Sequence, residues 1–149
     1  MDDATRLNQL AADLSPLITA RFMDSGTWTP TYLGDVTAGV TTYVGAGTSG
    51  YWYRVGSVVT VIGRVEWTAA TGAGTGIVSL PFISSSATNQ EARLAVAMSN
   101  IVFSGYVTGA VFAGQSVMVL ISTQSNVAAS LVPIDTNGGL IGFSGTYVI

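Results

Sequence analysis

The sequence predicts an all-β protein that begins with a short helical segment, and three observations lead to this fold class. After residue 24, Thr, Val, Ile and aromatic residues recur in short runs separated by Gly-rich turns such as GAGTSG at 45–50 and DTNGG at 135–139. Val117–Ile121 is apolar on both faces, as in a central strand. The length of 149 residues suits one domain with a small appendage. We therefore expect a β-sandwich or jelly-roll head over 26–149 behind a helical segment at 1–23.

The N-terminal segment has the pattern of a short coiled coil. Asp2 or Asp3 can cap the helix, and Ser15-Pro16 is expected to start a second short helix that ends at Phe22. A two-heptad seam does not assemble alone in water, so it would act as a stalk on an oligomer held together elsewhere. The alternative is one amphipathic helix packed on its own domain. The expected interface residues, spaced 3-4-3 along the helix, are Leu7, Leu10, Leu14 and Leu17.

The stretch YWYRVGSVVTVIGRVEW at 51–67 predicts a hairpin with a tight turn at Gly56-Ser57. Alternation places Val59, Val61, Val65 and Trp67 on one face, which is entirely apolar and predicted to be core. The opposite face starts apolar at Val58 and ends charged, as expected if it runs from a subunit contact to solvent. Its two charged residues, at 64 and 66, could form an ion pair.

The remaining strands are predicted from shorter runs between turns. They are Thr41–Val44, Ile77–Phe82, Arg93–Asn100, Ile101–Val107, Ala110–Phe112, Ser116–Thr123, Ala128–Ile134 and Leu140–Ile149.

Charge is scarce, and this predicts self-association. Hydrophobic residues make up 48% and charged residues 9% of the chain, against about 25% charged in an ordinary domain. Lysine is absent. Copies of the chain would cover much of the surface, although a surface made polar by Ser, Thr, Asn and Gly is the alternative. The net charge of −3 argues against nucleic acid or anionic lipid as partner. The acidic N-terminus does not resemble a signal peptide, and no apolar run approaches the ~18 residues of a membrane span.

No residue pattern predicts catalysis, a metal or a cofactor. The chain has no histidine and no cysteine, which excludes triads and thiolate sites. The Gly-rich segments lack the Lys-Ser/Thr ending of a phosphate loop, and the loop at 135–137 offers too few oxygens for calcium. A glycan hydrolase would have to use two carboxylates in a cleft. The candidates for that weakest alternative are Glu66, Glu91, Asp35 and Asp135.

Aromatic residues are the candidates for binding a glycan or a receptor. Tyr51, Trp52 and Tyr53 are consecutive, so Trp52 points to the opposite side from both tyrosines. Tyr106 and Phe112 are weaker candidates for an exposed apex beside a turn near Gly109. The alternative for each is a place in the core or in a subunit contact.

The motifs of residues 26–83 resemble a module of bacteriophage and prophage fibre and spike proteins. They are the Gly-x-Trp-x-Pro entry at 26–30, the Tyr51–Val65 hairpin and the Leu-Pro-Phe run at 80–82. The resemblance implies a homotrimeric, non-enzymatic virion protein. Its N-terminal segment would join another virion protein, and its head would bind a host-surface glycan or protein. The alternative is a monomeric carbohydrate-binding module that uses an aromatic strip.

Overall fold

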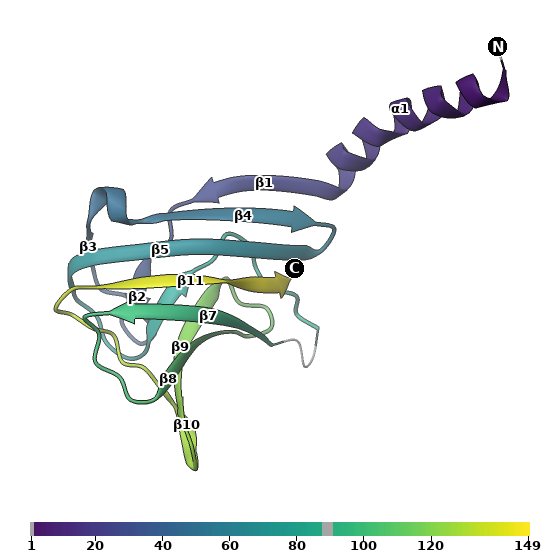
Figure 1. Ribbon diagram of the computed structural model, residues 1–149. Helices are drawn as coiled ribbons and strands as arrows, with labels where there is room; N and C mark the ends of the chain where they lie inside the picture. The colour runs from purple at the N-terminus through teal and green to yellow at the C-terminus, as the bar shows by residue number, and fades with distance from the viewer. Residues whose placement is uncertain (1, 88–90) are drawn as a thin grey trace.

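Figure 1 shows the computed structural model of the chain, which describes residues 2–87 and 91–149, and the side chains of all of these except 15–23. Within this part the chain forms one helix, α1 (Asp3–Phe22), one short 3₁₀ turn, η1 (Gly45–Gly47), and eleven strands joined by turns and loops. The all-β prediction for the part after the helix is confirmed. The strands are β1 (Met23–Trp28), β2 (Tyr32–Gly34), β3 (Thr41–Tyr43), β4 (Ser49–Val55), β5 (Val58–Ala70), β6 (Gly76–Ser79), β7 (Ala92–Ser99), β8 (Tyr106–Val111), β9 (Val117–Gln124), β10 (Val127–Leu131) and β11 (Gly139–Val148).

The strands join in one antiparallel hydrogen-bonded sheet with the order β1-β4-β5-β11-β7-β8-β9-β6-β2. Strand β3 pairs with β5, and β10 pairs with β9. Figure 1 shows the long strands β1, β4, β5, β11 and β7 lying side by side, while β8, β9 and β10 run steeply away from them. The sheet therefore curls, and its concave side encloses the core.

The hairpin predicted at 51–67 is confirmed. Val55 pairs with Val58 across Gly56-Ser57, and Gly56 has the positive φ of 59° that a two-residue turn needs. Val59, Val61, Val65 and Trp67 are between 0% and 2% exposed. Side chains along β5 thus alternate between the core and the opposite face, which is mostly exposed to solvent.

The core joins residues from both ends of the chain. Strand β11 pairs with β5 over its whole length and buries Ile141, Phe143 and Tyr147 beside the β5 valines. The Tyr32 ring of β2 packs on Trp67 with ring centroids 4.2 Å apart. Further core side chains come from β6 to β9 and from the connections that hold Leu80, Ile101 and Val132, which closes the curled sheet over one apolar interior.

Strand β8 differs from its prediction. It runs continuously through Gly109, where the sequence suggests a turn between two strands, and residues 101–105 before it are a loop. The reason is packing across the strand pair, because a Cβ at Gly109 would collide with the side chain of Met118 on β9. The glycine makes room for a buried neighbour and does not end the strand.

The N-terminal region also differs. Helix α1 passes through Pro16 as one helix, so the prediction of a second helix starting at Ser15 is wrong. Proline removes one backbone donor from the helix but does not by itself end it here. The cap is as predicted, since the Asp2 carboxylate accepts the Thr5 amide at 2.7 Å, and this bond and the one from the Thr5 hydroxyl lower the Asp2 pKa. Strands β1 and β2 were not predicted.

Two buried tyrosine hydroxyls tie segments without regular structure to the sheet. The Tyr147 hydroxyl donates to the Phe82 carbonyl and accepts from the Phe82 amide, both at 3.2 Å. The Tyr32 hydroxyl accepts the Asp135 amide at 2.9 Å. Burial raises the pKa of both tyrosines, to about 12 for Tyr147.

We expect Gly63→Ala to destabilise the fold by about 1–3 kcal/mol, because the added Cβ would collide with the Phe143 ring inside the core. Gly45→Ala is the matched control, since a Cβ there meets nothing within 4 Å. Urea unfolding of both variants measures the difference. Equal midpoints for the two variants would contradict the packing described here.

We also expect stability to fall at alkaline pH. The unfolded tyrosines ionise near their ordinary pKa of 10, whereas folded Tyr147 stays neutral to about 12. The stability that the neutral, buried Tyr147 contributes is therefore fully present below pH 10 and is lost as the pH rises toward 12. Melting temperatures between pH 7 and 11.5 test this, and Tyr147→Phe should flatten part of the slope. Tyr106→Phe, which removes the hydroxyl of a residue that is 82% exposed, should keep the slope. A melting temperature that does not change up to pH 11.5 would contradict the assignment.

Candidate binding surfaces

Helix α1 projects from the edge of the sheet with apolar side chains in solvent. Figure 1 shows it leaving the head beside β1, the strand that it continues into. Leu7, Leu10 and Leu14 are 66%, 54% and 43% exposed. They lie along one side of the helix at the predicted spacing, while the side chain of Leu17 lies outside the described residues. In the single chain, the described part of the predicted seam does not fold back on the head.

The long strands present to solvent a face with many apolar side chains, whose charged residues include Arg64, Glu66 and Arg93. We call it the outer face; it is the side of β4, β5, β11 and β7 opposite the core. Cross-strand register places Tyr51, Ile62, Ser144 and Ala95 in one row across these four strands. The large side chains of the face are Tyr51, Tyr53, Val55, Val58, Ile62 and Val148, each between 37% and 56% exposed. Where the outer face crosses β11 and β7, its side chains are small and leave a slight hollow around Ala95, Ala97, Gly142 and Ser144.

The three consecutive aromatics separate as alternation requires. Tyr51 and Tyr53 stand on the outer face with a shallow hollow of about 160 Å³ between them and β1. The Trp52 ring is turned to the core side, where it meets Phe82 edge-on at 4.8 Å between ring centroids. The structure thus brings the two tyrosines together and separates Trp52 from them.

Tyr106 and Phe112 lie apart. They flank the two ends of β8, six residues or roughly 20 Å from one another along a strand. Tyr106 is 82% exposed and Phe112 is 39% exposed. They do not form one apex, because Gly109 lies inside the strand between them and does not form a turn.

The carboxylates proposed for hydrolysis are held by local partners. Glu66 forms an ion pair with Arg64 at 2.6 Å, as the sequence suggests, and Glu91 pairs with Arg93. The Asp35 carboxylate accepts the Thr75 amide at 2.6 Å, and that of Asp135 accepts the Asn137 amide. These contacts give each acid a structural role at a turn or along a strand.

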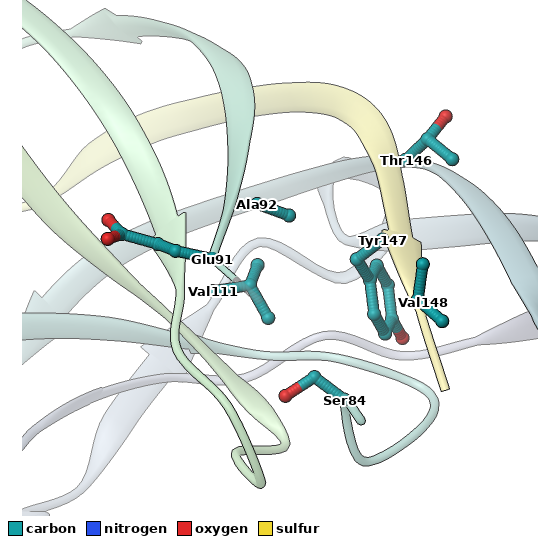
Figure 2. Close-up of a pocket in the computed structure, with 7 residues that line it drawn as sticks. All are labelled: Ser84, Glu91, Ala92, Val111, Thr146, Tyr147 and Val148. Carbon is teal, nitrogen blue, oxygen red and sulfur yellow. The ribbon is translucent and has the colours of Figure 1, made fainter. Parts of the chain in front are cut away.

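A cavity of about 330 Å³ lies near the C-terminal end of β11 (Figure 2). Its polar groups are mostly occupied, because the Ser84 hydroxyl bonds to the Phe112 carbonyl and the Gln115 amide. The Tyr147 hydroxyl is bonded to the backbone, and Figure 2 shows the Glu91 carboxylate pointing away from the Tyr147 ring. This cavity offers a mainly apolar wall to a ligand.

A second, more polar groove of about 440 Å³ lies where three connecting segments meet at the opposite end of the sheet. We call it the end groove. The connections are β3–β4, β7–β8 and β10–β11, so no single stretch of sequence reveals the groove. Asn100, with a φ of 61°, and Gly138, with a φ of 99°, turn the chain around it. Its lining is Val44, Glu66, Trp67, Thr68, Ser99, Asn100, Asn137, Gly138, Gly139 and Leu140.

Neither a metal-ligand cluster nor a membrane-spanning helix is found among the described residues. The described part of the chain contains no cluster of three or more potential metal-ligating His, Cys, Asp or Glu residues. Among the same residues, no helix is both long and apolar enough to cross a bilayer.

Comparison with known proteins places the fold. No protein-family model and no curated protein sequence matches this chain. Among solved structures, the chain is similar to the Dettilon tailspike protein, with a TM-score of 0.65 and 15% sequence identity. The match covers 89% of this chain and 25% of the tailspike chain, so this chain spans about a quarter of that protein's length. At this level of identity the likeness is one of fold alone.

Proposed function

We propose that this chain is a virion protein that forms a homotrimeric fibre or spike and attaches the particle to the host cell surface. The observation that carries the proposal is the fold, which matches a portion of a phage tailspike over nearly all of this chain. In this proposal residues 1–23 join the trimer to another virion protein. Residues 26–149 form a sandwich-like or jelly-roll-like head displayed at the particle surface.

The trimer is supported by apolar groups that a single chain leaves in solvent. The α1 leucines and the large apolar side chains of the outer face, from Tyr51 to Val148, are exposed in the single chain. Exposed apolar patches of this extent in a folded chain mark interaction surfaces. Three parallel copies of α1 would bury the leucines along a common axis. Tyr51 and Tyr53 would then belong to subunit contacts on the outer face.

Attachment is proposed to be by binding, without catalysis. The local partners of Glu66, Glu91, Asp35 and Asp135 support structural roles for these acids. Tyr106, with most of its ring in solvent, remains a candidate for contact with a receptor, whereas Phe112 and the core-packed Trp52 are weaker ones.

We expect the double substitution Leu10→Arg/Leu14→Arg to lower the mass from trimer toward monomer, because six guanidinium groups cannot be buried along one axis. Light scattering coupled to size exclusion measures the mass. Loss of avidity should also weaken binding to host cells at least tenfold. The control is Asn8→Arg, an exposed helix position off the seam. A monomeric wild-type protein at micromolar concentration would contradict the proposal.

The alternative, a monomeric carbohydrate-binding module, is favoured by one observation: Tyr51 and Tyr53 are both more than half exposed and flank a hollow. Tyr51→Ser/Tyr53→Ser separates the two functions. If the tyrosines pack between subunits, the variant loses mass by subunit dissociation. If they stack on sugars, it loses glycan binding while its mass stays that of the wild type.

A further inference from the structure

We infer that the end groove binds a neutral, hydroxyl-rich sugar residue. This inference rests on the proposed function, since it names the ligand class and the residues through which the head would contact the cell surface.

The groove lies at the end of the head that is farthest from α1. Met23, which directly follows α1, pairs with Val55 at one end of the sheet. From that end β5 runs to Thr68 in the groove, ten residues or roughly 30 Å away. Figure 1 shows α1 and the C-terminus at the same end of the long strands. A trimer anchored through α1 would thus point the groove away from the particle.

The polar groups of the groove suit hydroxyl ligands. The amides of Asn100 and Asn137 each offer a donor and an acceptor, the pairing that adjacent sugar hydroxyls require. Within the described part of the chain, neither amide side chain has a hydrogen-bond partner in the protein. Ser99 adds a hydroxyl, and Glu66 adds a strong acceptor.

These groups are held in place by the fold. Arg64 fixes the Glu66 carboxylate at 2.6 Å, and the Asp135 carboxylate accepts the backbone N–H of Asn137 at 2.8 Å, which fixes the turn that carries this residue. Trp67 lies beneath the groove, where it is 2% exposed, and its indole nitrogen donates to the Asp135 carbonyl at 3.2 Å, which holds the connection that carries Asn137. The partly buried Leu140 offers an apolar surface to the C–H face of a sugar ring. Groups pre-positioned on three loops of a rigid sheet form the usual arrangement of a binding site.

The charge of the groove favours neutral sugars over acidic ones. Its ionisable lining group is a carboxylate, and the nearby cation, Arg64, is already paired with it. An acidic sugar or a phosphate would therefore meet repulsion without a free cation to bind it. The cavity beside Tyr147 is less suitable, because its hydroxyls already bond to the protein.

The test compares one near-isosteric double variant with a matched control on an array of immobilised neutral and acidic oligosaccharides. Asn100→Asp/Asn137→Asp removes both amide donors and adds negative charge with little change in shape. Asn126→Asp is the control, because Asn126 is exposed and shares the φ of 61° with Asn100 but lies in the β9–β10 turn. Melting temperatures and masses of all proteins establish that each folds and assembles as the wild type does.

We expect the wild type to bind neutral oligosaccharides, the double variant to bind them at least tenfold more weakly, and the control to bind as the wild type. In the wild type, the side-chain amide NMR signals of Asn100 and Asn137 should shift on adding the bound sugar, a readout that needs no variant. Unchanged binding by the double variant, or binding of acidic sugars alone, would overturn the inference.

A separate cell-binding experiment distinguishes failure of the groove inference from failure of the proposed function. Binding of the labelled wild-type trimer to a panel of bacterial strains is measured with and without the double variant as competitor. If the trimer binds cells but no neutral sugar, or if the double variant competes fully, the groove inference fails and the proposed function stands. If the wild type is monomeric and binds no strain, the proposed function fails.

Discussion

The pairing of β5 with β11 is the contact on which the rest of the structure depends. Ten consecutive residue pairs join 58–67 to 139–148, and their inward side chains form the centre of the core. Strand β4 is attached to the free edge of β5, and β7 is attached to the free edge of β11. Because this ladder joins segments about eighty residues apart in the sequence, the sheet cannot close until the end of the chain is in place.

The scarcity of charge in the second half of the chain affects how its surface interacts with other molecules. From residue 94 to the C-terminus the sequence contains one charged residue, Asp135. Isolated sheets of this composition tend to associate through apolar faces and edges. The α1 leucines and the apolar side chains of the outer face are exposed in the single chain. The proposed oligomer would cover both.

The two ends of the long strands differ in polarity: the end beside α1 is apolar, and the opposite end is polar. The end that adjoins α1 carries apolar side chains such as Val55, Val58 and Val148. The opposite end gathers the amides, hydroxyls and carboxylate of the end groove. An assembly end and a binding end on one rigid sheet are consistent with the proposed role in attachment.

Local patterns in the sequence determined a helix cap at Asp2 or Asp3, the all-β class, the Gly56-Ser57 hairpin and the buried face of β5. Each depends on neighbouring residues, because capping, turn chemistry and alternation act over a few positions. The tertiary structure alone decided that Gly109 lies inside a strand, since the reason is the Met118 side chain on another strand. It also turned Trp52 to the core and brought residues 66, 100 and 137 to one groove. Such meetings depend on strand order and register, which are set by packing between distant segments and leave no local signal.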